Sequence, residues 1–204
     1  TQPVRLFFPT GLAKTPDGTL LVANGNFNHA FDSGTVVSIS RAYLDSLFQK
    51  KLNCDVVTPD LACYATIAAD PTPPLPNAVM IGNYAGPLAL SDDGTAAYTG
   101  SRDSGRLNAL RVDPGGALHC APGAGDGTRK DCRKGRIDLT PAGVDGPYTI
   151  VPGTTVIPGT ATLEKVLFVS SVVPHIDEIS SGILSTNSSV AVLKMYPDPS
   201  PLLY

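Results

Sequence analysis

The segment that begins at residue 24 carries the most unusual set of oxygen-bearing side chains in the sequence. Asn24, Asn26 and Asn28 alternate along the chain, and Asp32 follows them closely. Side-chain amides and carboxylates are calcium ligands, and alternating ligands can wrap around the ion. Calcium loops usually contain more carboxylates, so the other interpretation is a polar turn whose Asn side chains bond to their own backbone. The sequence therefore predicts either a calcium site formed by these four residues or a self-satisfied turn.

The four cysteines form two local pairs along the chain. Cys54 and Cys63 enclose one short loop, and Cys120 and Cys132 enclose another. Neither pair has the close spacing of a zinc site. Two disulfides, each stapling one loop, are the simplest interpretation, and they imply an oxidising compartment. Four free thiols in a reducing compartment are the alternative, which the low content of charged residues disfavours.

No recognisable catalytic motif accompanies these residues. His29, His119 and His175 do not pair at a spacing typical of metal ligands. Segment 174–178 (PHIDE) combines a histidine with two carboxylates, which could serve acid–base catalysis but is more typical of an exposed insertion. The sequence has no G-x-S-x-G elbow, P-loop or dinucleotide fingerprint. We therefore predict no catalytic and no cofactor-binding residues, while enzymatic activity stays an open alternative.

The composition narrows the functional class. Of the 204 residues, 42% are hydrophobic and 16% are charged, so the chain can bury a core. The net charge of -3 argues against nucleic-acid binding, which normally needs a basic stripe. We interpret the one basic run as a solvated loop, with contact to an acidic partner or an anionic surface as the alternative. It consists of Arg129, Lys130, Arg133, Lys134 and Arg136. No apolar run reaches the roughly 18 residues of a transmembrane helix.

Two segments share one pattern of strands and turns. Asp17-Gly18-Thr19 in segment 9–40 corresponds to Asp93-Gly94-Thr95 in segment 86–116. In both, glycine supplies the positive φ that the turn needs. The strands expected in the first copy are 11–15, 19–23 and 35–39, and those of the second copy include 96–99 and 106–112. The pattern indicates two copies of one three-strand unit.

The rest of the chain fits a third unit and two insertions. Strands are expected at 147–152, 166–172 and 189–196. A helix is expected over 40–51, with Ser40 as its N-cap. A Pro-rich connector follows at 71–76. The strand expected at 78–82 belongs either to the outer edge of the first unit or to the next unit.

The motif G-L-A-x-x-P-D-G-x-L-L-V-A-N followed by S-G-T-V-V-S-I resembles NHL-like and YVTN-type β-propeller repeats. The resemblance is strong over 9–40 and 86–116 and weaker over 147–196. The chain is also similar to a group of secreted bacterial propeller lipoproteins that share a V-A-N/S-G-N-F loop and Cys-bearing insertions. The resemblance implies an all-β fold with about three propeller blades and one short helix in a single domain, 1–204. The blade-like units lie near 7–40, 78–116 and 147–196, and the disulfide-stapled insertions are 41–77 and 117–146.

Three blades are fewer than a closed propeller needs, which is typically about four or more. We therefore expect a partial ring that a protein partner or a further part of the same chain completes. Oligomerisation of the chain, or a fourth blade hidden in the insertions, would also close the ring. The chain starts at Thr1 with neither a signal segment nor a lipid-bearing cysteine, which favours a processed chain or a piece of a longer one.

The expected function is a non-catalytic binding or scaffold subunit that is secreted, periplasmic or on the outer surface. It would act through protein–protein contacts on its loops. A metal-dependent propeller hydrolase or lyase of the lactonase kind is one alternative. A structural subunit of a larger membrane-associated or filamentous assembly is another. Fold alone does not choose among these functions.

Overall fold

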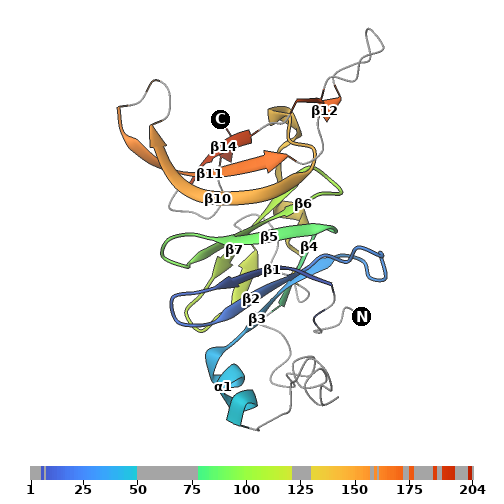
Figure 1. Ribbon diagram of the computed structural model, residues 1–204, viewed down its shortest axis with the longest axis vertical. Coiled ribbons are helices and arrows are strands. Elements are labelled where there is room, and N and C mark those ends of the chain that lie inside the picture. The colour runs from blue at the N-terminus through green and yellow to red at the C-terminus, as the bar shows by residue number, and fades with distance from the viewer. Residues whose placement is uncertain are drawn as a thin grey trace.

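Antiparallel β-sheets make up most of the chain, as the computed structural model in Figure 1 shows, so the predicted all-β class is confirmed. The structure describes residues 6, 8–49, 78–120, 130–156, 159, 161–171, 175–176, 186–187, 190–195 and 202–203. Three larger sheets follow one another along the chain and are stacked, with α1 (Arg41–Gln49) below the first of them in Figure 1. A fourth sheet has two strands.

Consecutive strands pair with each other in the larger sheets. The first sheet contains β1 (Pro9–Lys14), β2 (Leu20–Asn24), β3 (Gly34–Ile39) and β4 (Ala78–Ile81). The second contains β5 (Ala85–Leu90), β6 (Ala96–Ser101), β7 (Arg106–Val112), β8 (Leu118–Cys120) and β9 (Ile137–Asp138). The third contains β10 (Pro147–Val156), β11 (Leu163–Ser171), β14 (Val190–Lys194) and β15 (Leu202–Leu203). The two-stranded sheet pairs β12 (His175–Ile176) with β13 (Thr186–Asn187).

The two aspartate–glycine turns predicted as equivalent have the same structure. Each aspartate accepts a hydrogen bond from the backbone N–H two residues later, at 3.2 Å for Thr19 on Asp17 and 3.0 Å for Thr95 on Asp93. Gly18 and Gly94 have φ values of 89° and 71°, a region in which residues with a Cβ are strained. The two turns therefore share one hydrogen-bonding pattern, and the three-strand repeat stays a prediction.

The helix α1 begins where its capping residue predicts. The Oγ of Ser40 accepts a hydrogen bond from the backbone N–H of Tyr43 at 3.2 Å, which satisfies one free donor of the first turn. Tyr43 and Leu44 pack against Val22, Val37 and Ile39 on the outer face of the first sheet. The helix therefore covers apolar β-sheet surface that would otherwise face water.

Two hydrophobic cores hold the three sheets together. Leu21, Val36 and Ile81 of the first sheet pack against Leu110 and Leu118 of the second, all of them buried. A separate core joins the other face of the second sheet to the third, and its fully buried members include Leu107, Leu139, Leu167, Val169 and Leu193. The middle sheet is thus buried on both faces.

Glycine allows the first two sheets to approach closely. A Cβ at Gly11 in β1 would lie 2.7 Å from the backbone N of Leu88 and 2.8 Å from the backbone O of Gly86, both in β5. Contacts that short do not occur for real side chains, so only glycine fits where the two backbones meet.

Strand pairing revises two boundaries drawn from the sequence. The strand at residues 78–81 is β4, which pairs with β3, so it lies in the first sheet and the second sheet begins at Ala85. Segment 117–146, expected to be an insertion, supplies β8 and β9, which both pair with the outer edge of β7. Strands of three and two residues are too short to give a periodic pattern in the sequence.

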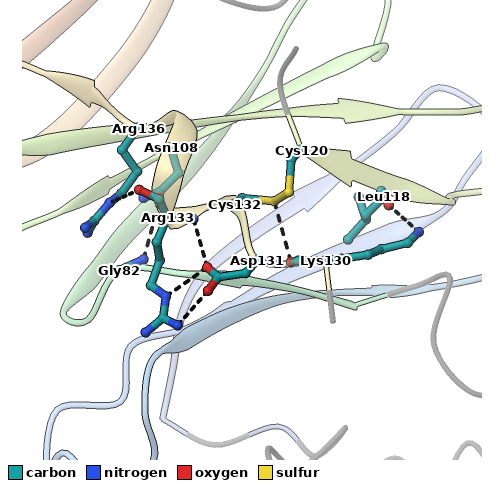
Figure 2. Close-up of a disulfide and its surroundings, with 9 residues drawn as sticks. All are labelled: Gly82, Asn108, Leu118, Cys120, Lys130, Asp131, Cys132, Arg133 and Arg136. Atoms are coloured by element: carbon teal, nitrogen blue, oxygen red, sulfur yellow. Dashed lines mark hydrogen bonds and ion pairs between the residues drawn. A yellow bond between two sulfur atoms is a disulfide. The ribbon is translucent and has the colours of Figure 1, made fainter. Parts of the chain in front are cut away.

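One predicted disulfide is confirmed. Cys120 and Cys132 are bonded, with a Cα–Cα distance of 4.9 Å, and both are buried (Figure 2). The predicted Cys54–Cys63 pair and the Pro-rich connector 71–76 lie outside the described residues. Within the described part of the chain, no helix is long and apolar enough to cross a membrane.

Candidate functional site

Several loops meet at one end of the three stacked sheets. Because the strands are antiparallel, the β2–β3, β4–β5 and β6–β7 connections all leave from this end, and β10 begins there. Four side chains from these connections and one from the start of β10 form what we call the aromatic–arginine cluster. It consists of Phe27, His29, Tyr84, Arg102 and, on β10, Tyr148. Each of the three larger sheets contributes to it.

Tyr84 is the centre of the cluster. The ring of Phe27 meets it edge to face, with centroids 5.2 Å apart and an interplanar angle of 78°. His29 lies on it at 5.0 Å, and the His29 Nε2 is hydrogen-bonded to the Tyr84 hydroxyl at 2.9 Å. Edge-to-face pairs are a favourable arrangement for aromatic rings. The contacts fix the β2–β3 loop against the β4–β5 connection.

Arg102 extends the cluster from the middle sheet to both neighbouring sheets. Its Cζ lies 5.3 Å from the ring centroid of Phe27 and 5.3 Å from that of Tyr148, distances at which a cation is attracted to an aromatic ring. The Nε of Arg102 also donates to the backbone O of Tyr84 at 3.3 Å. The guanidinium is thus fixed by two rings and one carbonyl, while Tyr148 stays 44% exposed.

Backbone strain is concentrated under this cluster. Of the described residues other than glycine, five have positive φ, and Phe8, Asn26, His29 and Tyr84 are four of these. They are linked through main-chain hydrogen bonds, from Gly25 N to Phe8 O at 2.9 Å and from Tyr84 N to Gly25 O at 2.6 Å. A left-handed backbone is unfavourable for bulky residues and persists where the surroundings enforce it, often at binding sites. The strain therefore marks this loop end as a candidate for function.

Asn26 supports the strained loop from beneath. Only 1% of this residue is exposed, and its Nδ2 donates to Phe31 O at 2.8 Å and to Asn83 Oδ1 at 2.7 Å. Its Oδ1 accepts from Phe31 N at 3.2 Å. The side chain therefore ties the β2–β3 loop to itself and to the β4–β5 connection.

The four residues predicted as a calcium site lie around this loop but make other bonds. Asn24 is buried and donates to Thr35 Oγ1 at 3.0 Å, and the Oδ1 of Asn28 accepts from Ala30 N at 3.1 Å. The backbone O of Asp32 accepts from Arg133 Nη1 at 3.1 Å. The bonded amides of Asn26 and Asn28 favour the self-satisfied turn, and calcium binding stays a prediction. Among the described residues, no group of three or more His, Cys, Asp or Glu could hold a metal ion.

The basic run expected as a solvated loop is instead part of the folded structure wherever it is described. Arg133 binds Asp131 through two hydrogen bonds, at 2.8 and 2.6 Å (Figure 2). This pair lowers the pKa of Asp131, first through the side-chain bond from Arg133, and raises that of Arg133. The Nζ of Lys130 donates to Leu118 O at 2.7 Å. The interpretation as a solvated loop was wrong for Lys130, Arg133 and Arg136, which bond to neighbouring backbone, hydroxyl and carboxylate groups. Lys134 is exposed.

Arg136 is the half-buried cation of this region. Its Nε donates to Arg133 O at 3.0 Å, and its Nη1 donates to Ser104 Oγ at 3.1 Å, in the same β6–β7 loop that carries Arg102. Burial lowers the pKa of Arg136, and the nearby Arg106 lowers it further, while Asp103 acts in the opposite direction. The loop end therefore contains a guanidinium whose hydrogen-bond partners are neutral.

The other histidines lie elsewhere. His119, on β8, has its Nε2 2.9 Å from Asp113 Oδ2, and Asp113 also pairs with Arg111 at 3.0 Å. This carboxylate lies in the turn after β7, at the end of the sheet opposite the cluster. His175 is on β12, and Asp177 and Glu178 lie outside the described residues.

Sequence reasoning found only part of the cluster. The amide-rich loop contains Phe27 and His29. No sequence motif marks Tyr84, Arg102 or Tyr148 as part of a site, because the residues that they contact are distant in the chain. No family model matches the chain, and no curated protein is significantly similar to it. The arrangement of the cluster is consequently the main source for a functional proposal.

Proposed function

We propose that this protein is a non-catalytic binding module whose loop end docks a protein partner, in the extracellular space or the cell envelope. The observation that carries the proposal is the aromatic–arginine cluster. Tyrosine and arginine are enriched among the residues that dominate binding energy at protein interfaces. Here they are held in place before any partner arrives, so little side-chain entropy would be lost on binding.

The three larger sheets, in this proposal, are blades of an NHL/YVTN-like propeller. Their sequential strand order, their stacking through separate cores and the matched turns at Asp17 and Asp93 support this. A ring of this kind presents loops on a rigid disc, which suits a scaffold. A protein partner or a further part of the chain would complete the ring.

The disulfide supports the extracellular or envelope location that we propose. The Cys120–Cys132 disulfide is buried at the edge of the core between the first two sheets. Structural disulfides persist in secreted and periplasmic proteins and are rare in reducing compartments. We therefore place the binding module on the outer side of a cell membrane.

Site-specific photo-crosslinking in the cells that make the protein tests the docking proposal. A benzophenone amino acid replaces Tyr148 at the cluster, and in a control it replaces Arg41, which is exposed on α1 at the opposite end of the first sheet. We expect one adduct of defined mass from position 148 and none from position 41. Purified wild-type protein should suppress the adduct, and protein with Arg102→Ala should not. Equal adducts from both positions, or none from position 148, would overturn the proposal.

A further inference from the structure

Arg102 has a hydrogen-bonding edge that no acceptor of the described residues occupies. Its bonds within the described part of the chain run from the backbone N and from Nε, both to Tyr84 O, and the remaining contacts are with the rings of Phe27 and Tyr148. Neither Nη nitrogen is bonded to an acceptor among the described residues. Within the described part of the chain the guanidinium is thus fixed at Nε and has no acceptor at Nη, where paired N–H donors match the two oxygens of a carboxylate.

We propose that Arg102 is a carboxylate receptor, and that the partner's docking segment is an acidic stretch of polypeptide. The inference rests on the proposed function and names the chemistry of the partner. An Asp or Glu side chain would bind the Nη edge of Arg102. The rings of Phe27, Tyr84 and Tyr148 would contact the neighbouring aliphatic or aromatic side chains of the same segment. Aromatic surfaces beside a charged anchor are typical of energetically important interface residues.

The charge around Arg102 favours the same ligand. Among the described residues, Arg136 donates only to neutral oxygens, one of them on Ser104 of the β6–β7 loop. Burial and the nearby Arg106 lower the pKa of Arg136, while Asp103, next to Arg102, raises it. Arg133 is different, because its charge is compensated by Asp131 at 2.6 Å. Arg102 and Arg136 therefore have no bonded carboxylate among the described residues, although the whole chain has a net charge of -3. A guanidinium without a bonded carboxylate attracts an acidic segment to this surface.

The ring contacts also make arginine specifically suited to this position. A lysine at residue 102 would keep the charge but lose the planar fork and the stacking on Phe27 and Tyr148. Arg102→Lys therefore separates recognition by geometry from attraction by charge. Arg102→Gln removes both, and Arg41→Gln removes one exposed positive charge from the opposite end of the molecule.

Fluorescence polarisation with labelled hexaglutamate and hexaglutamine peptides tests the inference on the purified chain. We expect binding of hexaglutamate and none of hexaglutamine. Losing a hydrogen-bonded charge pair weakens binding by about tenfold or more, which we expect for Arg102→Gln. Arg102→Lys should also bind clearly more weakly than wild type, whereas Arg41→Gln should stay within about twofold. Thermal unfolding of each variant shows whether it is folded, and Tyr148→Ala, which leaves the bond to Tyr84 O intact, provides a second reduced-affinity variant.

Four outcomes would overturn the inference. Hexaglutamate binding that Arg102→Gln leaves unchanged would exclude Arg102 as the receptor. Equal weakening by Arg102→Gln and Arg41→Gln would show unspecific attraction. Tighter binding of a phosphorylated peptide or an oligonucleotide than of hexaglutamate would show a different ligand class. A crosslink at position 148 without any hexaglutamate binding would overturn the carboxylate inference and leave the docking proposal intact, so the two can fail separately.

Discussion

At the residue scale, the loop end depends on Asn26, a buried side chain in a left-handed backbone conformation. Asparagine tolerates this conformation better than most residues. Its amide donates to Phe31 O and to Asn83 Oδ1, and it accepts a hydrogen bond from Phe31 N. The position therefore requires the backbone tolerance and the hydrogen-bonding capacity of asparagine together.

Replacing Asn26 by Asp should destabilise the protein strongly. The carboxylate keeps an acceptor for Phe31 N but has no donor for Phe31 O and Asn83 Oδ1, and it faces those two oxygens while buried. We expect a loss of about 3 kcal/mol in the free energy of unfolding, measured by chemical denaturation. Asn28→Asp is the matched control, because this exposed residue needs only its acceptor, for Ala30 N. It should stay within about 0.5 kcal/mol of wild type. Equal losses in the two variants would contradict the role of Asn26.

At the element scale, the turns at Asp17 and Asp93 each stabilise a charged carboxylate by hydrogen bonds. Hydrogen bonds from Thr15, Gly115 and Thr19 lower the pKa of Asp17 to about 2. Bonds from the Ser91 side chain and from Thr95 lower the pKa of Asp93 to about 2 as well. The Gly115 bond, 3.0 Å from its N to Asp17 Oδ2, joins the first sheet to a turn of the second. One carboxylate thus stabilises both its own turn and the contact between sheets.

The depressed pKa values predict a defined loss of stability in acid. In the unfolded chain an aspartate has a pKa of about 3.9. The contribution of the two carboxylates to the stability of the fold is therefore complete above that pH, and it is lost as the pH falls to about 2. The double variant Asp17→Asn, Asp93→Asn keeps an acceptor in each turn and should show a shallower decrease over this range. Because both carboxylates are mostly exposed, we expect a difference below about 1 kcal/mol per turn. Urea unfolding at several pH values measures it, and an unchanged slope would refute it.

The disulfide constrains the outer edge of the second sheet. Cys120 ends β8, and Cys132 begins the short 3-10 helix η1 (Cys132–Gly135) before β9. The bond spans 12 residues, a loop for which cross-linking contributes about 3 kcal/mol by restricting the unfolded chain. The double variant Cys120→Ala, Cys132→Ala should lose about that much free energy of unfolding in denaturant titrations. A variant as stable as wild type would show that η1 holds the edge without the disulfide.

The sequence predicted elements better than their assembly, for physical reasons. Strand β3 is a run rich in β-branched residues bounded by turns, and helix α1 has a capping serine. Strands β8 and β9 depend on pairing with β7 and not on their own residues. The cluster likewise depends on the stacking of the sheets, which brings Tyr148 of the third to Phe27 of the first through Arg102. Local patterns do not encode such contacts.

At the scale of the whole molecule, the outer faces of the first and third sheets differ. Helix α1 packs on the outer face of the first sheet over Val22, Val37 and Ile39, while Leu12 at the edge of that face is exposed. On the third sheet, Val151, Phe168 and Val192 are cross-strand neighbours on the face opposite Leu167 and Leu193. Val151 is 50% exposed, and Val190, two residues before Val192 on the same face of β14, is 61% exposed. An apolar sheet face of this kind is typical of a surface that another sheet or another chain covers.

The exposed face predicts self-association of the purified chain through the third sheet. Burying apolar surface is favourable, so two copies should pair on this face when no other partner covers it. Sedimentation velocity over a range of concentrations should show a concentration-dependent increase in mass. Val151→Lys should abolish it, because a charge would have to be buried at the interface, while a half-exposed lysine costs the separate chain little. Leu12→Lys, on a residue 66% exposed in β1, is the control and should associate like wild type. If Leu12→Lys and not Val151→Lys prevented association, the interface would lie on the first sheet instead of the third.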